Sequence, residues 1–224
     1  MRVTIHQPQY LPYLGFFHKV KRCDVFIALD DVQFQKNGLQ NRNKIKNANG
    51  WQWLTVPVKH RLEQSISEVE INSQQRWGQK HWNALKTNYS KAEYFSTYAA
   101  ELEALLTSSW SKLCPLNMAL TEWAFKHLDI APRVVYSSEL EVEGESTDRL
   151  VNLCKAVGGD RYLSGPGGKR YLREGAFPES GLTLEYQQFK HPTYPQMFPK
   201  TEFVPYMSIV DALFCCGPGA RLLI

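Results

Sequence analysis

The feature that most constrains the fold is a pair of apolar runs joined by a helical pattern at the N-terminus. Residues 3–5 form a short apolar run, and residues 13–22 place Leu14, Phe17 and Val20 on one helix face. Residues 23–29 form a second, continuous apolar run, as is typical of a strand covered on both faces in a parallel sheet. A helix between two such strands forms a right-handed crossover. The pattern predicts an α/β fold with a mostly parallel sheet and flanking helices.

The rest of the chain alternates strand and helix signals around one helical stretch. Strands are expected at residues 51–58, 66–71, 133–137, 161–163 and 182–189. Between them, residues 75–128 repeat apolar side chains at helical spacing, as in Trp82, Leu85 and Tyr89. We therefore expect an α/β core made of residues 1–74 and 129–224, with a helical insertion or subdomain at 75–128.

Polar residues and glycines mark helix ends and loops. Ser146 is expected to cap a helix that ends at Gly158-Gly159, and Ser208-Ile209-Val210-Asp211 matches a capping box. Residues 38–50 and the Pro-rich stretch 191–205 are expected to be loops.

Charge and composition narrow the class of partner. Lys and Arg outnumber Asp and Glu by 26 to 22, a mild basic excess that suits an anionic small molecule but is too weak to predict nucleic-acid binding. The chain shows neither a signal peptide nor an apolar stretch long enough to span a bilayer, so we expect a cytoplasmic protein without a membrane partner. Its five cysteines lack zinc-site spacing and are expected to be reduced.

The first candidate site is the turn after the first strand, which contains His6, Gln7, Gln9 and Tyr10. A helix beginning there would present backbone N–H groups to a phosphate. His6, at the end of the strand, is expected to titrate near neutrality and to act as a proton donor or acceptor. The alternative is a rigid proline turn with a structural histidine.

The second candidate site is Asp30-Asp31, followed by Gln33, directly after the second apolar run. Adjacent carboxylates can hold Mg²⁺ or a substrate ammonium group. Because loops that follow parallel strands share one edge of the sheet, we expect this pair to line the same cleft as the first turn. The alternative is a solvated turn.

Three further segments carry anion-binding chemistry. Asn41 and Arg42 combine an amide with a cation that can grip a phosphate or carboxylate, although charged loops are often only solvated. A glycine-rich turn could form an anion nest, or serve only as a turn, and comprises Ser164, Gly165, Gly167, Gly168 and Lys169. His191 lies in the long Pro-rich loop, which is either a ligand lid or packing.

Several of these motifs, in this order, resemble the WbqC-like family. The segments that carry the resemblance are residues 6–17, 24–34, 40–45, 53–58, 163–168 and 203–211. The resemblance implies a role in gene clusters for O-antigen, other surface sugars or secondary-metabolite sugars. It also implies the addition of glycine or another small acyl unit to an amino sugar.

A more distant similarity is to the nucleotidylyltransferase-like (HUP-like) fold, and to pantothenate synthetases in particular. In those proteins a Gln-Phe pair like Gln33-Phe34 touches substrate, and a Leu-Ser motif like Leu163-Ser164 holds phosphates. They carry His-x-Gly-His in the first loop, where this chain has Tyr10-Leu11-Pro12-Tyr13. The usual phosphate contacts would then have to come from His6, His18 or Arg42.

Together these observations predict a transferase or ligase that forms an amide on an amino sugar, with a nucleotide-linked sugar as its small-molecule substrate. The resemblance allows ATP and Mg²⁺ as cofactors, with His6, Asp30 and Asp31 as the catalytic candidates. The alternatives are a non-catalytic nucleotide-sugar binding protein and a nucleotidylyltransferase. The sequence allows a homo-oligomer and does not identify the sugar or the acyl donor.

Overall fold

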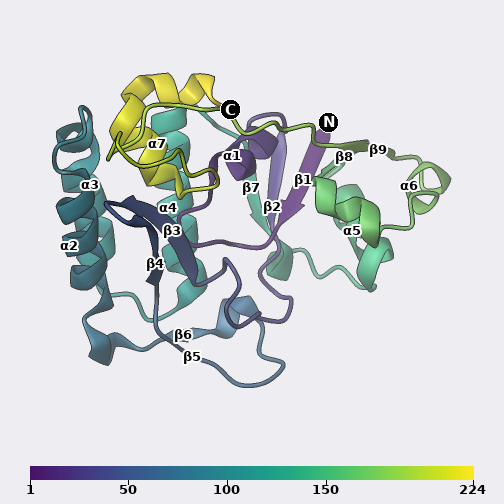
Figure 1. The fold of residues 1–224 in the computed structure, drawn as a ribbon. Helices are drawn as coiled ribbons and strands as arrows, with labels where there is room; N and C mark the ends of the chain where they lie inside the picture. Colours follow the sequence, from purple (N-terminus) through teal and green to yellow (C-terminus); the bar gives the residue numbers. More distant parts are fainter.

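Five parallel strands form the central sheet in a computed structural model that describes residues 1–224 (Figure 1). Their order across the sheet is β7 (Arg133–Tyr136), β2 (Val25–Ala28), β1 (Arg2–His6), β8 (Arg161–Ser164) and β9 (Thr183–Tyr186). Every neighbouring pair in this sheet is parallel. The predicted α/β fold with a parallel sheet and flanking helices is confirmed.

Alternate residues of the strands supply two separate hydrophobic cores. Val25 and Ile27 pack on the side of α5 (Ser146–Ala156) and α6 (Ala176–Glu179). The intervening Phe26 belongs to the larger core on the opposite face, which contains α1 (Leu14–Val20). The sheet is thus buried on both faces, which explains why its strands read as continuous apolar runs.

Three helices form at residues 77–128, as the apolar spacing predicts: α2 (Trp77–Tyr89), α3 (Phe95–Thr107) and α4 (Leu113–Leu128). Their buried side chains belong to the same core as α1. The division of the chain into a core and an insertion stays a prediction. A last helix, α7 (Ile209–Cys216), packs on this side. The short 3₁₀ helices of the chain are η1 (Ile66–Glu68), η2 (Ser73–Gln75), η3 (Ser137–Glu139), η4 (Pro166–Arg170) and η5 (Gly217–Leu222).

The segment expected to be a loop at 38–50 contains a strand. β3 (Arg42–Asn47) pairs antiparallel with β4 (Gly50–Thr55) outside the main sheet. Asn43 and Ile45 are buried while Lys44 between them is not. Burial therefore alternates along this part of the strand, but the sequence does not show it because most of the residues are polar. The expected edge strand at 66–71 is largely η1, and only β6 (Glu70–Ile71) pairs, with β5 (Val58–Lys59).

The expected start of α7 after Ser208 is confirmed, but neither expected side-chain cap forms. The residue before α5 is Glu145, and Ser146 is its first helical residue. Ser208 does precede α7, but its side chain makes no capping bond. The Asp211 carboxylate instead accepts hydrogen bonds from the hydroxyls of Tyr89, at 2.6 Å, and Tyr194, at 2.8 Å. Because Asp211 is fully buried, these long-range donors outcompete the local backbone and tie the 191–205 loop to α7.

All five cysteine thiols are free. None of the helices combines the length and the apolarity needed to cross a bilayer.

We predict that Gly78→Ala destabilises the protein. A Cβ atom at Gly78 would lie 1.9 Å from the Leu106 carbonyl oxygen, so α2 would have to move away from α3. Overpacking of this kind typically costs about 1–3 kcal/mol, more than the roughly 0.5–1 kcal/mol that alanine gains over glycine in a helix. Urea unfolding measures the change. The control is Gly219→Ala, where a Cβ meets nothing within 4 Å, and equal stability of the two variants would refute the prediction.

Candidate functional site

A pocket of about 410 Å³ opens where β1 and β8 end, next to α1. The chain places β2 on one side of β1 and β8 on the other, so the crossover from β1 to β2 and the crossover from β8 to β9 run in opposite directions. Open parallel sheets bind ligands at this kind of reversal, outside the carboxyl ends of the strands. The first turn and the glycine-rich turn both line the pocket, through residues that include His6, Gln7, Ser164 and Gly165.

His6 contributes a neutral imidazole to the pocket. Its Nδ1 lies 3.0 Å from the Gln7 carbonyl oxygen, which can only accept, so Nδ1 carries the proton and Nε2 keeps a lone pair. The ring packs edge-on against Phe16. Burial, and then the charge of Lys19, lower the pKa of His6 to about 3. This overturns the expectation that His6 titrates near neutrality, because the ring stays neutral there and serves as a hydrogen-bond acceptor.

Lys19 is the cation of the pocket. Its side chain extends from α1, is 3% exposed, and has its Nζ 3.3 Å from the Ile5 carbonyl oxygen. Seven ion pairs form in the protein, and none includes Lys19. Burial lowers the pKa of its ammonium group to about 8. A buried cation without a counter-ion is unfavourable for folding and marks a wall suited to an anionic ligand.

The sequence analysis missed Lys19. It assigned the buried face of the helix to Leu14, Phe17 and Val20, and the short helix is in fact buried on every side. The helical spacing could have shown it: Lys19 follows Gly15 by four residues and Phe16 by three, so the three share one helix face, and all three line the pocket.

The glycine-rich turn leaves room for a ligand beside backbone. A Cβ added at Gly165 or Gly167 would meet no atom within 4 Å, so both open onto the pocket. A Cβ at Gly168 would instead lie 2.2 Å from the Ser164 hydroxyl oxygen. That hydroxyl is 2% exposed and donates to the Gly165 carbonyl at 3.1 Å. The turn is therefore stabilised by its own hydrogen bond, and its backbone faces the pocket without a covering side chain.

Neutral polar groups complete the wall. Gln187 Nε2 donates to the Gly15 carbonyl at 2.7 Å and lies 2.8 Å from His18 Nδ1. Burial lowers the pKa of His18 to about 4, so this histidine is also neutral and accepts from Gln187. Tyr13 and Tyr171 add two phenol rings. Lys19 is thus the one charged side chain that lines the pocket.

Asp30 and Asp31 do not line this pocket, contrary to the expectation that they share the cleft of the first turn; they follow its lining residue Leu29 in the chain. Asp30 accepts from the backbone N–H of Ser138 at 3.1 Å and from its hydroxyl at 2.9 Å. Asp31 accepts from the Ser137 hydroxyl at 2.6 Å and pairs with Arg149. Both carboxylates already have protein donors, and no cluster of three or more His, Cys, Asp or Glu side chains has metal-site geometry. They do not fit Mg²⁺, so we derive no step through a metal.

Seven other predicted residues do not line the pocket: Gln9, Tyr10, Gln33, Asn41, Arg42, Lys169 and His191. Tyr10 is fully buried, with its hydroxyl 2.8 Å from His81 Nδ1. Arg42 stacks its guanidinium 4.3 Å above the Trp53 ring on the β3–β4 hairpin. Whether any of them binds substrate stays a prediction.

His191 anchors the Pro-rich loop beside the pocket. Its Nδ1 lies 2.8 Å from the Pro192 carbonyl oxygen, and its Nε2 accepts from the Tyr206 backbone N–H at 3.0 Å. Both ring nitrogens are therefore occupied. The Tyr206 ring packs at 5.8 Å against Tyr13, which lines the pocket, so the end of the loop lies at the pocket's rim.

The reversal in strand order, with a small-molecule pocket beside it, defines an α/β protein of the doubly wound class. The chain belongs to the WbqC-like protein family, which it matches over residues 7–222. It is 35% identical to the uncharacterized protein Rv1507c of Mycobacterium tuberculosis (strain ATCC 25618 / H37Rv) over 223 residues, covering 98% of this chain and 95% of that protein. No solved structure has significant similarity to this chain. The resemblance drawn from the motifs is confirmed.

We predict that Lys19→Met stabilises the protein. Lowering the pKa from 10.5 to about 8 corresponds to roughly 3 kcal/mol against the charged form in the folded state, and methionine fills the same space without a charge. We expect a gain of about 1–3 kcal/mol in the free energy of unfolding at pH 7, measured with urea.

The gain should shrink as the pH rises from 8 toward 10.5, because the folded wild type then loses the proton that the unfolded chain retains. The matched control is Lys21→Met, because Lys21 is exposed at the end of the same helix and should change stability by less than about 0.5 kcal/mol. A loss of stability in Lys19→Met comparable to a core deletion would contradict the prediction.

Proposed function

We propose that this protein is a biosynthetic transferase or ligase that holds a nucleotide-linked amino sugar in the pocket beside β1 and β8 and forms an amide on the sugar's amine. The observation that carries the proposal is Lys19, a buried ammonium group with no carboxylate partner at the wall of an open pocket. A phosphate of the ligand supplies the missing counter-charge. At about 4 Å and an effective dielectric constant of about 20, this attraction is worth about 4 kcal/mol.

The pocket can offset only part of a nucleotide's charge by itself. Lys19 balances one phosphate charge, and the remaining lining groups are neutral amides, hydroxyls and imidazole, so any second phosphate charge must face solvent or backbone N–H groups. Because no side chain covers the turn at Gly165 and Gly167, a ligand has space to lie against its backbone. If ATP activates the acyl group in a ligase reaction, other groups must compensate its further charges.

His6 has the right form to orient the amine. Its Nε2 lone pair accepts a hydrogen bond from the amine N–H, because Nδ1 is committed to the Gln7 carbonyl. The amine nitrogen then replaces the leaving group on an activated acyl carbon. One C–N bond forms and the bond from the acyl carbon to the leaving group breaks; the leaving group departs with the bonding electron pair and takes up the proton that the nitrogen loses.

A second candidate is a protein that binds the sugar nucleotide for a partner enzyme without reacting. It is favoured by the low pKa of His6 and by the hydrogen-bonded state of Asp30 and Asp31. These leave Lys19, with a pKa of about 8, as the one lining group that exchanges a proton near neutral pH, and pairing with a phosphate would keep it protonated. This candidate predicts binding without turnover.

The direct test incubates the protein with a panel of nucleotide-linked amino sugars, glycine and Mg-ATP, and detects a new amide, AMP and ADP by mass spectrometry. A new amide supports the transferase or ligase. Saturable binding of the sugar nucleotide without any product supports the passive binder. Absence of both binding and product refutes the proposed function.

We predict that Lys19→Met lowers affinity for the sugar nucleotide at least tenfold while the protein stays folded, because a charge-assisted contact is worth about 1.5–3 kcal/mol. Gly167→Leu should also abolish binding, since its side chain fills the open space of the pocket. Lys21→Met and Gly219→Leu are the matched controls. Isothermal titration calorimetry measures the affinities, and unchanged binding in both pocket variants would place the ligand elsewhere.

The affinity of the wild type should depend on pH with a defined sign. Lys19 is cationic below about pH 8 and loses its charge above it, so affinity for the anion falls as the pH rises through 8, approaching tenfold per pH unit. Titrations from pH 6 to about 9.5 test this. Lys19→Met should show a flat profile over the same range, and an equally steep profile in this variant would exclude Lys19 as the cause.

A further inference from the structure

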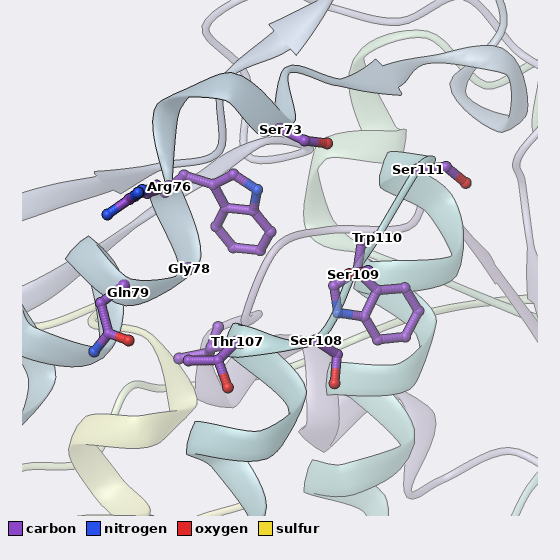
Figure 2. A pocket seen from close by; sticks show the side chains of 11 residues that line it. Ser73, Arg76, Gly78, Gln79, Thr107, Ser108, Ser109, Trp110 and Ser111 are labelled. Atoms are coloured by element: carbon purple, nitrogen blue, oxygen red, sulfur yellow. The ribbon is translucent and has the colours of Figure 1, made fainter.

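A second cavity, of about 550 Å³, lies between the start of α2 and the end of α3 (Figure 2). It shares no lining residue with the pocket beside β1 and β8. The two helices that form it lie at the side of the molecule opposite β8, β9 and α6 (Figure 1). The proposed function leaves this cavity unexplained.

The cavity has a rigid frame. At Gly78 the backbone of α2 comes so close to α3 that no Cβ would fit against the Leu106 carbonyl. Beside this contact, Trp77 is only 6% exposed and lines the cavity. Trp110 donates its indole N–H to the Leu105 carbonyl at 2.7 Å, which holds its ring at the end of α3. Two indoles are therefore held in place at the cavity wall.

Most of the other lining groups are polar, and none is acidic. Hydroxyl groups come from Ser73, Thr107, Ser108, Ser109 and Ser111. Thr107 donates to the Glu103 carbonyl at 2.7 Å and Ser108 to the Ala104 carbonyl at 2.5 Å, so their lone pairs are left to accept from a ligand. In Figure 2, Arg76 and Gln79 lie on one side of the cavity, and Ser108, Trp110 and Ser111 on the other.

Arg76 is the one charged residue at this cavity. Its guanidinium has no hydrogen-bond or ion-pair partner within the chain, although five N–H donors are available. Its backbone adopts the left-handed conformation, with φ 44°, which costs a non-glycine residue about 1–2 kcal/mol. Arg76 is exposed, and in Figure 2 its side chain extends away from Trp110, so its guanidinium is a solvated cation at the rim of the cavity that an anionic ligand can pair with.

We propose that this cavity binds a sugar unit that carries a carboxylate, such as a hexuronate. A pyranose ring presents a C–H face that packs on indole and a rim of hydroxyls that exchange hydrogen bonds with serine, threonine and amide groups. The planar guanidinium of Arg76 pairs with a carboxylate through two parallel hydrogen bonds. The site is independent of the pocket beside β1 and β8, and a glycan bound here would be a second ligand.

The test titrates the protein with a trisaccharide of galacturonate, following tryptophan fluorescence and calorimetry. Arg76→Asn is the informative variant, because asparagine tolerates the left-handed conformation and keeps a polar side chain. We expect it to weaken uronide binding about tenfold, as loss of a charge-assisted contact predicts. The matched control is Lys80→Asn, an exposed cation of the same helix that does not line the cavity, and it should bind as the wild type does.

Two further arms keep the result interpretable. Ser109→Trp, which projects a large ring from an exposed lining position, should block uronide binding while leaving binding of a sugar nucleotide unchanged. The neutral trisaccharide of galactose should bind wild type and Arg76→Asn alike. The proposal is overturned if the uronide does not bind at millimolar concentration, if Arg76→Asn binds it unchanged, or if uridine diphosphate occupies the site in its place.

Discussion

The pairing of β1 on both of its edges is the constraint on which the rest of the structure depends. Val3 is aligned with Val25 of β2 on one side and with Tyr162 of β8 on the other, and both pairings are parallel. Parallel neighbours require crossover connections, and those that follow β1 and β8 run in opposite directions, to β2 and to β9. The gap between those connections is where His6 and Ser164 meet at one pocket. A strand at the edge of the sheet could not have created it.

Burial then determines the charge state of the pocket. The same layer of helix that covers β1 carries Lys19 into the interior, where its ammonium lacks a counter-ion. That charge also contributes to the low pKa of His6. An anion that pairs with Lys19 removes this contribution, so ligand binding and the basicity of His6 are coupled. Under the proposed function, in which Lys19 binds the anion and His6 faces the amine, the two residues act as one electrostatic unit.

The carboxylates of the protein show the opposite arrangement. Asp31 pairs with Arg149, Asp30 is held by Ser138, and Asp211 accepts from two tyrosines. These contacts join strand ends and loops that are distant in sequence, as buried charges must when they stabilise a fold. These satisfied carboxylates contrast with Lys19, a buried cation that has no carboxylate partner.

The sequence alone determined the parallel α/β architecture, the helices between 77 and 128, and the meeting of the first turn with the glycine-rich turn. The sequence records these because a strand covered on both faces needs a continuous apolar run and a packed helix needs an apolar stripe, whichever element covers it. Only the tertiary structure decided which charges are paired. Asp31 and its partner Arg149 are 118 residues apart in the sequence. That Lys19 lacks a counter-ion is visible only once all of its neighbours are placed. Strand β3 was missed for a related reason, since its buried Asn43 is satisfied by the carbonyls of Tyr10 and Leu11, which no local pattern encodes.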